Sequence, residues 1–172
     1  MPETSHVHPA SPSARVRAAS RSDASALKAV IDATGLFPSE MLDDMLEPYL
    51  ADGAVEDIWL VVDDETDAPP PLGLAYCAPE RMTSGTWNLY LIAVHPSHQG
   101  KGFGGALAAS LEAMLAARGE RILLVETSGL PEFERTRAFY AKHGYEEEAR
   151  IREFYRAGED KVVFRKALAQ TA

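Results

Sequence analysis

The sequence predicts one mixed α/β domain with seven strands and four helices. Three observations indicate this class. A chain of 172 residues suits one compact domain and is too short for two full ones. Strand and helix patterns follow one another in the order β-α-α-β-β-β-α-β-α-β-β. The continuous apolar run Ile122–Val125 is typical of a central strand, so we expect a sheet covered on both faces.

In the N-terminal half, helix start and stop signals separate two helices from three strands. The expected elements are a strand at 15–19, helices at 24–34 and 38–50, and strands at 58–62 and 72–78. Ser22-Asp23 is typical of a helix N-cap and Gly35 of a helix end, while Asp52-Gly53 ends the second helix. The polar, triple-proline segment 63–71 predicts a hairpin turn between the last two strands.

In the C-terminal half, strands and helices alternate before a final hairpin. The expected elements are strands at 87–94 and 122–125, helices at 102–118 and 131–143, and strands at 146–154 and 161–166. Leu107, Leu111 and Leu115 recur at helical spacing, which supports the first of these helices. Gly144 ends the later helix, and Gly158 marks the turn of the hairpin.

Composition excludes several classes of function. The chain carries 17 Lys and Arg against 26 Asp and Glu, a net charge of −9, which argues against nucleic acid or an anionic membrane as partner. The lone Cys77 excludes an internal disulfide and a cysteine zinc cluster, and favours a reducing cytoplasm.

No apolar run approaches the ~20 residues of a membrane span. Residues 1–13 have prolines and no apolar core, so we expect a disordered tail rather than a signal peptide, followed by a domain over 14–169.

A glycine-rich loop carries the strongest local evidence for function. Gly100, Gly102, Gly104 and Gly105 lie between a strand that ends at Val94 and a helix. Backbone amides at such a helix start are unpaired donors at the positive end of the helix dipole, which is a site for an anion. No Asp or Glu occurs from residue 81 to residue 111, which agrees with a phosphate site. The alternative interpretation is a glycine-rich turn that binds nothing.

Two common phosphate motifs fit this loop poorly. Gly100-x-Gly102-x-x-Gly105 matches the dinucleotide fingerprint literally, but that fingerprint belongs directly after the first strand of a βαβ unit. A P-loop needs Ser or Thr after its lysine, and Lys101 is followed by Gly102. A dinucleotide-dependent enzyme therefore remains only as an alternative.

A third pattern fits better. Gln99-x-x-Gly102-x-Gly104, five residues past the strand, resembles the pyrophosphate loop of the GNAT superfamily of acyl-CoA-dependent N-acyltransferases, and segment 136–145 resembles the family's Phe-Tyr-x-x-x-Gly-Phe segment. The resemblance covers about residues 15–168. It implies a single GNAT-like α/β (α+β) domain with a mixed, mostly antiparallel sheet of about seven strands, four flanking helices and a splayed strand pair at the acyl-CoA site.

The resemblance also implies roles for particular residues. The Val94 amide would polarise the thioester carbonyl, the amides of 99–104 would hold the pyrophosphate, and Tyr140 would protonate the departing thiolate, while Phe139 packs on the sheet. Many relatives have an Asn where this chain has Phe133, so Arg135 or Arg137 is the expected substitute contact. The cofactor-binding residues implied are Ile92, Ala93, Val94, Gln99, Gly100, Lys101, Gly102, Phe103, Gly104, Arg137 and Tyr140.

The general base and the acceptor site are less sharply indicated. Glu126 follows a strand and would lie at the mouth of the cleft as the catalytic base, although an ordinary exposed carboxylate is an equal interpretation. Asn88 and Tyr90 alternate along the preceding strand and are candidates to order a water. The hairpin turn at 153–160 borders the acceptor site in relatives, and Phe37, Met41 and Met45 line it or belong to the core.

We therefore expect an N-acetyltransferase that moves the acetyl group of acetyl-CoA directly to a primary amine of a small molecule or peptide. The alternative is a non-catalytic acyl-CoA-binding sensor or partner domain. We expect no metal, because the histidines have no carboxylate at ligand spacing, and we expect Cys77 to be a buried hydrophobe. The negative charge favours a polyamine, aminoglycoside-like or basic peptide acceptor, but solubility explains the charge equally well, and amino-acid and amine metabolites remain alternatives. Relatives often form homodimers.

Overall fold

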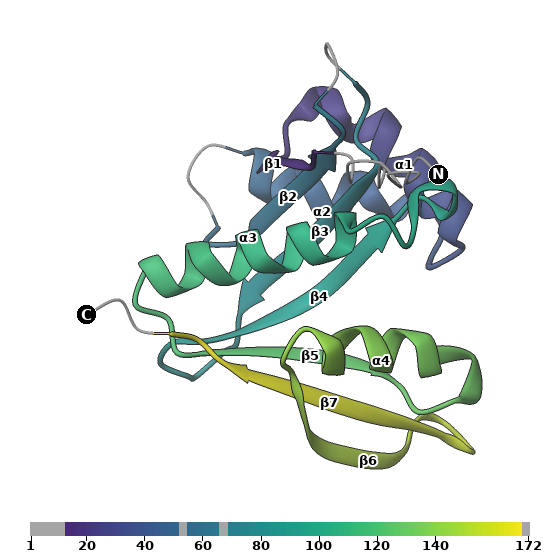
Figure 1. Ribbon diagram of the computed structural model, residues 1–172, viewed down its shortest axis with the longest axis vertical. Coiled ribbons are helices and arrows are strands. Elements are labelled where there is room, and N and C mark those ends of the chain that lie inside the picture. Colours follow the sequence, from purple (N-terminus) through teal and green to yellow (C-terminus); the bar gives the residue numbers. More distant parts are fainter. Residues whose placement is uncertain (1–12, 52–54, 66–68, 170–172) are drawn as a thin grey trace, which may run out of the picture.

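The computed structural model describes residues 13–51, 55–65 and 69–169, and these form seven strands and four α-helices (Figure 1). The strands are β1 (Arg15–Ala18), β2 (Ile58–Asp63), β3 (Gly73–Pro79), β4 (Thr86–Val94), β5 (Ile122–Ser128), β6 (Glu146–Arg156) and β7 (Glu159–Ala167). The helices are α1 (Ala24–Thr34), α2 (Met41–Leu50), α3 (Phe103–Ala117) and α4 (Glu134–Lys142).

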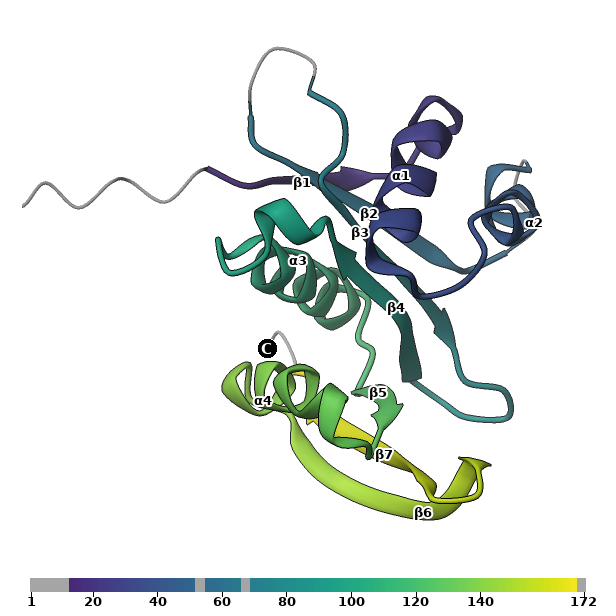
Figure 2. The same ribbon diagram turned by 90° about the vertical axis from the view of Figure 1, so that its right-hand side faces the viewer.

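All seven strands belong to one sheet, in the order β1-β2-β3-β4-β5-β7-β6. The β4–β5 pair is parallel, and the other neighbouring pairs are antiparallel. Helices α3 and α4 lie on one face of the sheet, and α1 and α2 lie on the other (Figure 2). The predicted mixed, mostly antiparallel sheet with four flanking helices is confirmed.

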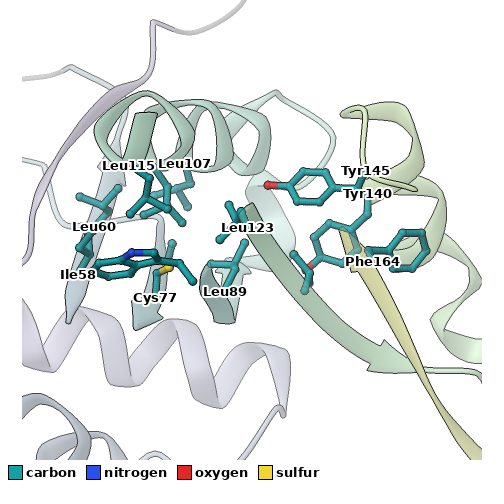
Figure 3. Close-up of a cluster of buried hydrophobic side chains, with 14 of the residues drawn as sticks. Ile58, Leu60, Cys77, Leu89, Leu107, Leu115, Leu123, Tyr140, Tyr145 and Phe164 are labelled. Atoms are coloured by element: carbon teal, nitrogen blue, oxygen red, sulfur yellow. The ribbon is translucent and has the colours of Figure 1, made fainter. Parts of the chain in front are cut away.

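Two hydrophobic clusters attach these helices to the sheet. The larger joins α3 to the central strands and continues to Tyr140, Tyr145 and Phe164 (Figure 3). The smaller packs α1 and α2 against Trp59 through fully buried residues such as Leu27 and Leu42. Burial of each such leucine stabilises the fold by roughly 1.5–3 kcal/mol. Because the sheet is packed between the two clusters, the ends of its strands are held in fixed positions.

Element bounds differ from the predicted ones where a tight turn precedes a helix. Residues 38–40 form a turn, in which Met41 N–H donates to the Pro38 carbonyl at 3.0 Å, so α2 begins at Met41. Pro131–Phe133 is a 3-10 turn, and α4 starts after it.

Strand β5 extends to Ser128, beyond the apolar run. Residues 1–12 of the predicted tail (1–13), the Asp52-Gly53 helix end and part of the 63–71 turn (66–68) lie outside the described residues.

The central parallel pair diverges along its length. Strand β4 pairs with β5 only over Thr86–Leu89 and Ile122–Val125. Beyond these residues the two strands separate, with Tyr90–Val94 on one side of the gap and Glu126–Ser128 on the other, as Figure 1 shows. A β-bulge lies where the separation begins: the register with β3 moves from Leu91 opposite Tyr76 to Leu89 opposite Cys77, so Tyr90 is the extra residue. The predicted splayed strand pair is present.

Within the described ranges, no helix combines the length and the apolarity that a membrane-spanning segment needs.

Candidate active site

The glycine loop presents a row of unused backbone donors at the start of α3. The amides of residues 100–105 make no hydrogen bond to an acceptor among the described residues. Gly100 and Gly102 adopt φ of +75° and +93°, a region that disfavours side chains, and the space beside each is open. Such a row of unpaired amides at a helix N-terminus fits a diphosphate, because the donors are available and the helix dipole favours negative charge.

The diverging end of β4 supplies a second set of donors. His95 N–H donates to the Leu72 carbonyl at 2.8 Å. This bond shows which residues of β4 direct their backbone groups towards β3 and which direct them away. Because the ladder alternates, the backbone groups of Ile92 and Val94 point away from β3 and into the gap beside β5, and those of Ala93 point towards β3. The side-chain amide of Gln99 donates to the Val94 carbonyl at 3.1 Å, which agrees with this direction.

Tyr140 reaches the same gap from α4. Its ring is buried against Phe139, Tyr145 and Phe164, and the residue also lines the cleft described below. The Tyr140 hydroxyl makes no hydrogen bond to a described residue, whereas the neighbouring Tyr145 hydroxyl donates to Glu112 at 2.8 Å. Burial raises the pKa of Tyr140 above the ordinary value for tyrosine, so the phenol keeps its proton at neutral pH.

Phe139, the ring predicted to pack on the sheet, does pack against the core cluster, but Tyr140 is the more deeply buried of the two rings. Tyr140 belongs to the core cluster, and Phe139 is only partly buried and packs at its edge. The Phe139 ring lies 4.2 Å, centroid to centroid, from that of His143 and close to Gly104 in α3. The pair of adjacent aromatics therefore joins the two helices and the sheet, and both residues face the cleft.

Glu126 lies on the β5 side of the gap, and its charge is compensated. Lys161 Nζ lies 2.7 Å from Glu126 Oε2 and 3.6 Å from the centre of the Phe154 ring. The Lys161 side chain is only 11% exposed and that of Glu126 is 32% exposed. A carboxylate fixed by one ion pair and partly open to the cleft can accept a proton from a group that enters it.

These groups meet in one cleft of about 730 Å³. Its lining combines the glycine loop and residues of α4 with residues of several other elements: Leu36, Tyr90, Ile92, Val94, Glu126, Tyr155 and Glu159. Leu91 and Ala93 pack with α1 and α2, whereas Val94 and Tyr140 pack with α3. The cleft therefore passes through the sheet at the β4–β5 gap.

Several predicted residues lie away from this lining. The Arg137 guanidinium donates to the carbonyls of Ser128 and Leu130, at 2.8 and 2.9 Å, and thereby fixes the β5–α4 connection, while Arg135 lines the cleft. Lys101 is exposed outside the lining. Asn88 is buried and donates to Glu80, which also accepts from the Tyr90 hydroxyl. Phe37 and Met45 pack in the smaller core cluster, and Met41 is exposed.

Several residues of the site were missed by sequence reasoning, among them the lining residues His143 and Leu36 and Lys161, the ion-pair partner of Glu126. His143 is one helical turn from Tyr140, so its spacing could have identified it, and Leu36 follows a helix end that was predicted. Lys161 could not be identified from the sequence as a residue of the site, because it comes next to its partner Glu126 only when β5 and β7 pair. Cys77 is fully buried and burial raises its pKa, so it is not a nucleophile. Among the described residues, no three His, Cys, Asp or Glu gather closely enough to hold a metal ion.

Comparison with known proteins gives a consistent result. Residues 55–147 match the family model of the acetyltransferase (GNAT) domain. A proposed acetyltransferase of the GNAT family from Desulfovibrio desulfuricans is 32% identical, with a TM-score of 0.83 over 91% of this chain and 100% of that one. No curated protein sequence matches this chain.

Two more distant structures share the fold. The ribosomal-protein-S18-alanine N-acetyltransferase of Escherichia coli is 18% identical, with a TM-score of 0.72 over 93% of this chain and 97% of that one. A proposed acetyltransferase from Salmonella typhimurium, solved with its cofactor acetyl-CoA, is also 18% identical, with a TM-score of 0.75 over 93% of this chain and 96% of that one.

Proposed function

This chain belongs to the GNAT family of acetyltransferases, and from that premise we propose that its 14–169 domain moves the acetyl group of acetyl-CoA directly to a primary amine. One observation carries the proposal. Unpaired amides of the loop, the outward amides of Ile92 and Val94, the protonated Tyr140 and the Glu126 carboxylate all border one cleft. Holding the donor, polarising a carbonyl and moving two protons are the tasks of this transfer.

The loop and β4 would hold the donor. Acetyl-CoA supplies a thioester, whose carbonyl carbon bonds to the amine nitrogen as its carbon–sulfur bond breaks. The amides of residues 100–105 fit the diphosphate. The Ile92 and Val94 backbone groups would pair with the extended pantetheine arm where β5 no longer pairs, and the Val94 amide would donate to the carbonyl oxygen, which gains negative charge during attack.

Two side chains would move the protons. Glu126 accepts the proton that the amine, mainly an ammonium ion at neutral pH, must lose before its nitrogen attacks, and later returns that proton to solvent. Tyr140 donates its phenolic proton to the departing sulfur, which leaves as a thiol. The second N–H proton leaves as the amide forms and restores the Tyr140 phenol after it has protonated the sulfur. The buried position of Tyr140 supports this role, because its raised pKa keeps the proton available. Cys77 takes no part, so no acetyl-cysteine forms and the transfer is direct.

A thiol-release assay with purified protein tests the proposal. We expect a low-micromolar Kd for acetyl-CoA by calorimetry, and stoichiometric release of free thiol when a panel of primary amines is added. Binding without thiol release for any amine would favour the non-catalytic acyl-CoA-binding alternative. Stabilisation by NAD or NADP but not by acetyl-CoA would overturn the proposal.

Replacement of Glu126 tests the base. We expect Glu126→Gln to lower kcat about 100-fold at pH 7, and the deficit to shrink as pH rises towards the pKa of the amine, because solvent then removes the proton. Glu132→Gln is the matched control, since Glu132 also lines the cleft but lies in the turn before α4 and outside the β4–β5 gap. Equal losses in both variants, or a deficit that does not change with pH, would exclude Glu126 as the base.

A further inference from the structure

The part of the cleft lining that belongs neither to the glycine loop nor to α4 includes large apolar side chains, and we call five of its residues the acceptor end: Leu36, Tyr90, Glu126, Tyr155 and Glu159. Leu36, Tyr90 and Tyr155 are 49%, 52% and 46% exposed, and they come from the turn after α1, from β4 and from β6. Three large apolar side chains from separate elements, left open around one carboxylate, are typical of a ligand site.

The two tyrosines of the acceptor end lie within electrostatic reach of Glu126. Burial, the hydrogen bond to Glu80, and the charges of Glu80 and Glu126 raise the pKa of Tyr90 to about 12. Burial, followed by the charges of Glu126 and Glu159, raises the pKa of Tyr155. Both tyrosines therefore present neutral rings and hydroxyls around the carboxylate at neutral pH.

The carboxylates of the acceptor end already have cationic partners. Glu126 pairs with the nearly buried Lys161, and Glu159 pairs with Arg156, each at 2.7 Å. Of the three carboxylates that line the whole cleft, only Glu132, in the turn before α4, makes no ion pair with a described residue. The two lining carboxylates of the acceptor end are therefore compensated, and Glu80, which accepts from the Tyr90 hydroxyl at 3.1 Å, does not line the cleft.

This local balance discriminates between classes of amine. A polyamine or an aminoglycoside carries several ammonium groups, and each needs an uncompensated carboxylate to replace its hydration. At the acceptor end such a molecule would meet carboxylates that already have cationic partners, with Lys161 Nζ only 2.7 Å from Glu126 Oε2. A molecule with one amine and an apolar body would instead bury that body against the tyrosines and Leu36 while its nitrogen faces Glu126.

We infer that the acceptor is a primary monoamine with an aromatic or branched aliphatic body. The inference rests on the proposed function, and it reverses the expectation of a polycationic acceptor that the net charge suggests. Tyr155 and Tyr90 are its specificity-determining residues, and Lys161 is a positioning residue that holds Glu126 and repels additional positive charge.

The first test compares kcat/KM at pH 8.5 for phenethylamine, isoamylamine, spermidine and a lysine-rich peptide, with acetyl-CoA saturating. We expect the two monoamines to exceed the two polycations at least tenfold. Equal or faster turnover of spermidine or the peptide would overturn the inference and leave the proposed acetyl transfer intact. No thiol release with any amine, although acetyl-CoA binds, would overturn the proposed function and the inference with it.

The second test uses Lys161→Met, with Lys166→Met as matched control. Lys166 also forms a partly buried ion pair with a glutamate, but its partner Glu112 does not line the cleft, whereas Glu126, the partner of Lys161, does. We expect Lys161→Met to raise the ratio of kcat/KM for spermidine to that for phenethylamine about tenfold, and Lys166→Met to leave the ratio unchanged. Any loss of activity that results from a displaced Glu126 affects both amines equally and therefore cancels in the ratio. An unchanged ratio in Lys161→Met would contradict the assignment.

The third test replaces an apolar side chain of the acceptor end. We expect Tyr155→Ser to raise KM for phenethylamine about tenfold while KM for acetyl-CoA stays within twofold, because the ring contacts the acceptor and not the coenzyme. Thermal unfolding of the variant reports whether it folds. A folded Tyr155→Ser protein with an unchanged KM for phenethylamine would exclude the Tyr155 ring as the acceptor contact.

Discussion

Gly102→Asp is expected to weaken acetyl-CoA binding at least 100-fold. Gly102 precedes α3 in the middle of the unpaired amides, and the space beside its Cα is open, so the new carboxylate would project without a steric clash. Its negative charge would lie among donors that fit a diphosphate. A loss of about 2.8 kcal/mol in binding free energy corresponds to the expected 100-fold change, and one displaced charge-assisted hydrogen bond with charge repulsion is sufficient for it.

Gly119→Asp is the matched control, because Gly119 follows the other end of the same helix. Its φ is +80°, and the space beside it is also open. Both variants therefore carry the same backbone strain, of order 1–3 kcal/mol, and the same added charge. Calorimetric titration should give Gly119→Asp an affinity for acetyl-CoA within about twofold of the unmodified protein. Similar weakening in both variants would mean that strain or net charge, and not the loop amides, governs binding.

Tyr140→Phe is expected to lower kcat about 100-fold while the Kd for acetyl-CoA stays within twofold. The substitution removes only a hydroxyl that has no hydrogen-bond partner among the described residues, so the packing against Tyr145 and Phe164 is kept. General acid catalysis contributes about 100-fold or more, and the thiolate would then have to leave without a proton. Steady-state kinetics with calorimetry separates the two effects.

Tyr145→Phe provides the comparison, because the same chemical change is made at a neighbouring buried ring. Here the hydroxyl donates to Glu112, so we expect a loss of about 1–2 kcal/mol in the free energy of unfolding and little change in kcat. The pH dependence gives a further readout. Since burial raises the pKa of Tyr140, its proton is retained below that raised value, and kcat should not fall through its ionisation below about pH 10. Equal effects of the two variants on kcat would make Tyr140 structural.

Sequence reasoning was sufficient for the fold because its main features have local causes. The element order follows from periodicity and from helix start and stop residues, and β5 is identified by its apolar run. The glycine loop was also predictable, because only backbone is needed for its donors and Gly102 is required by its positive φ.

Side-chain partners across the sheet were not predictable in the same way. Lys161 meets Glu126 only through the register of β5 with β7, and the buried ring of the Phe139–Tyr140 pair depends on how α4 is rotated against the sheet. Arg137 has the charge expected of a phosphate ligand, but its guanidinium donates hydrogen bonds to the carbonyls of Ser128 and Leu130 instead. These side-chain contacts depend on how segments far apart in the sequence pack together, and the local sequence pattern contains no information about that packing.

A crystal structure of the protein with acetyl-CoA tests the central claim most directly. The account predicts the diphosphate within hydrogen-bond distance of the amides of residues 100–105, the pantetheine arm paired with Ile92 and Val94 in the β4–β5 gap, and the thioester sulfur beside the Tyr140 hydroxyl. A coenzyme bound elsewhere on the protein, with the glycine loop facing solvent and the gap filled by side chains, would contradict it.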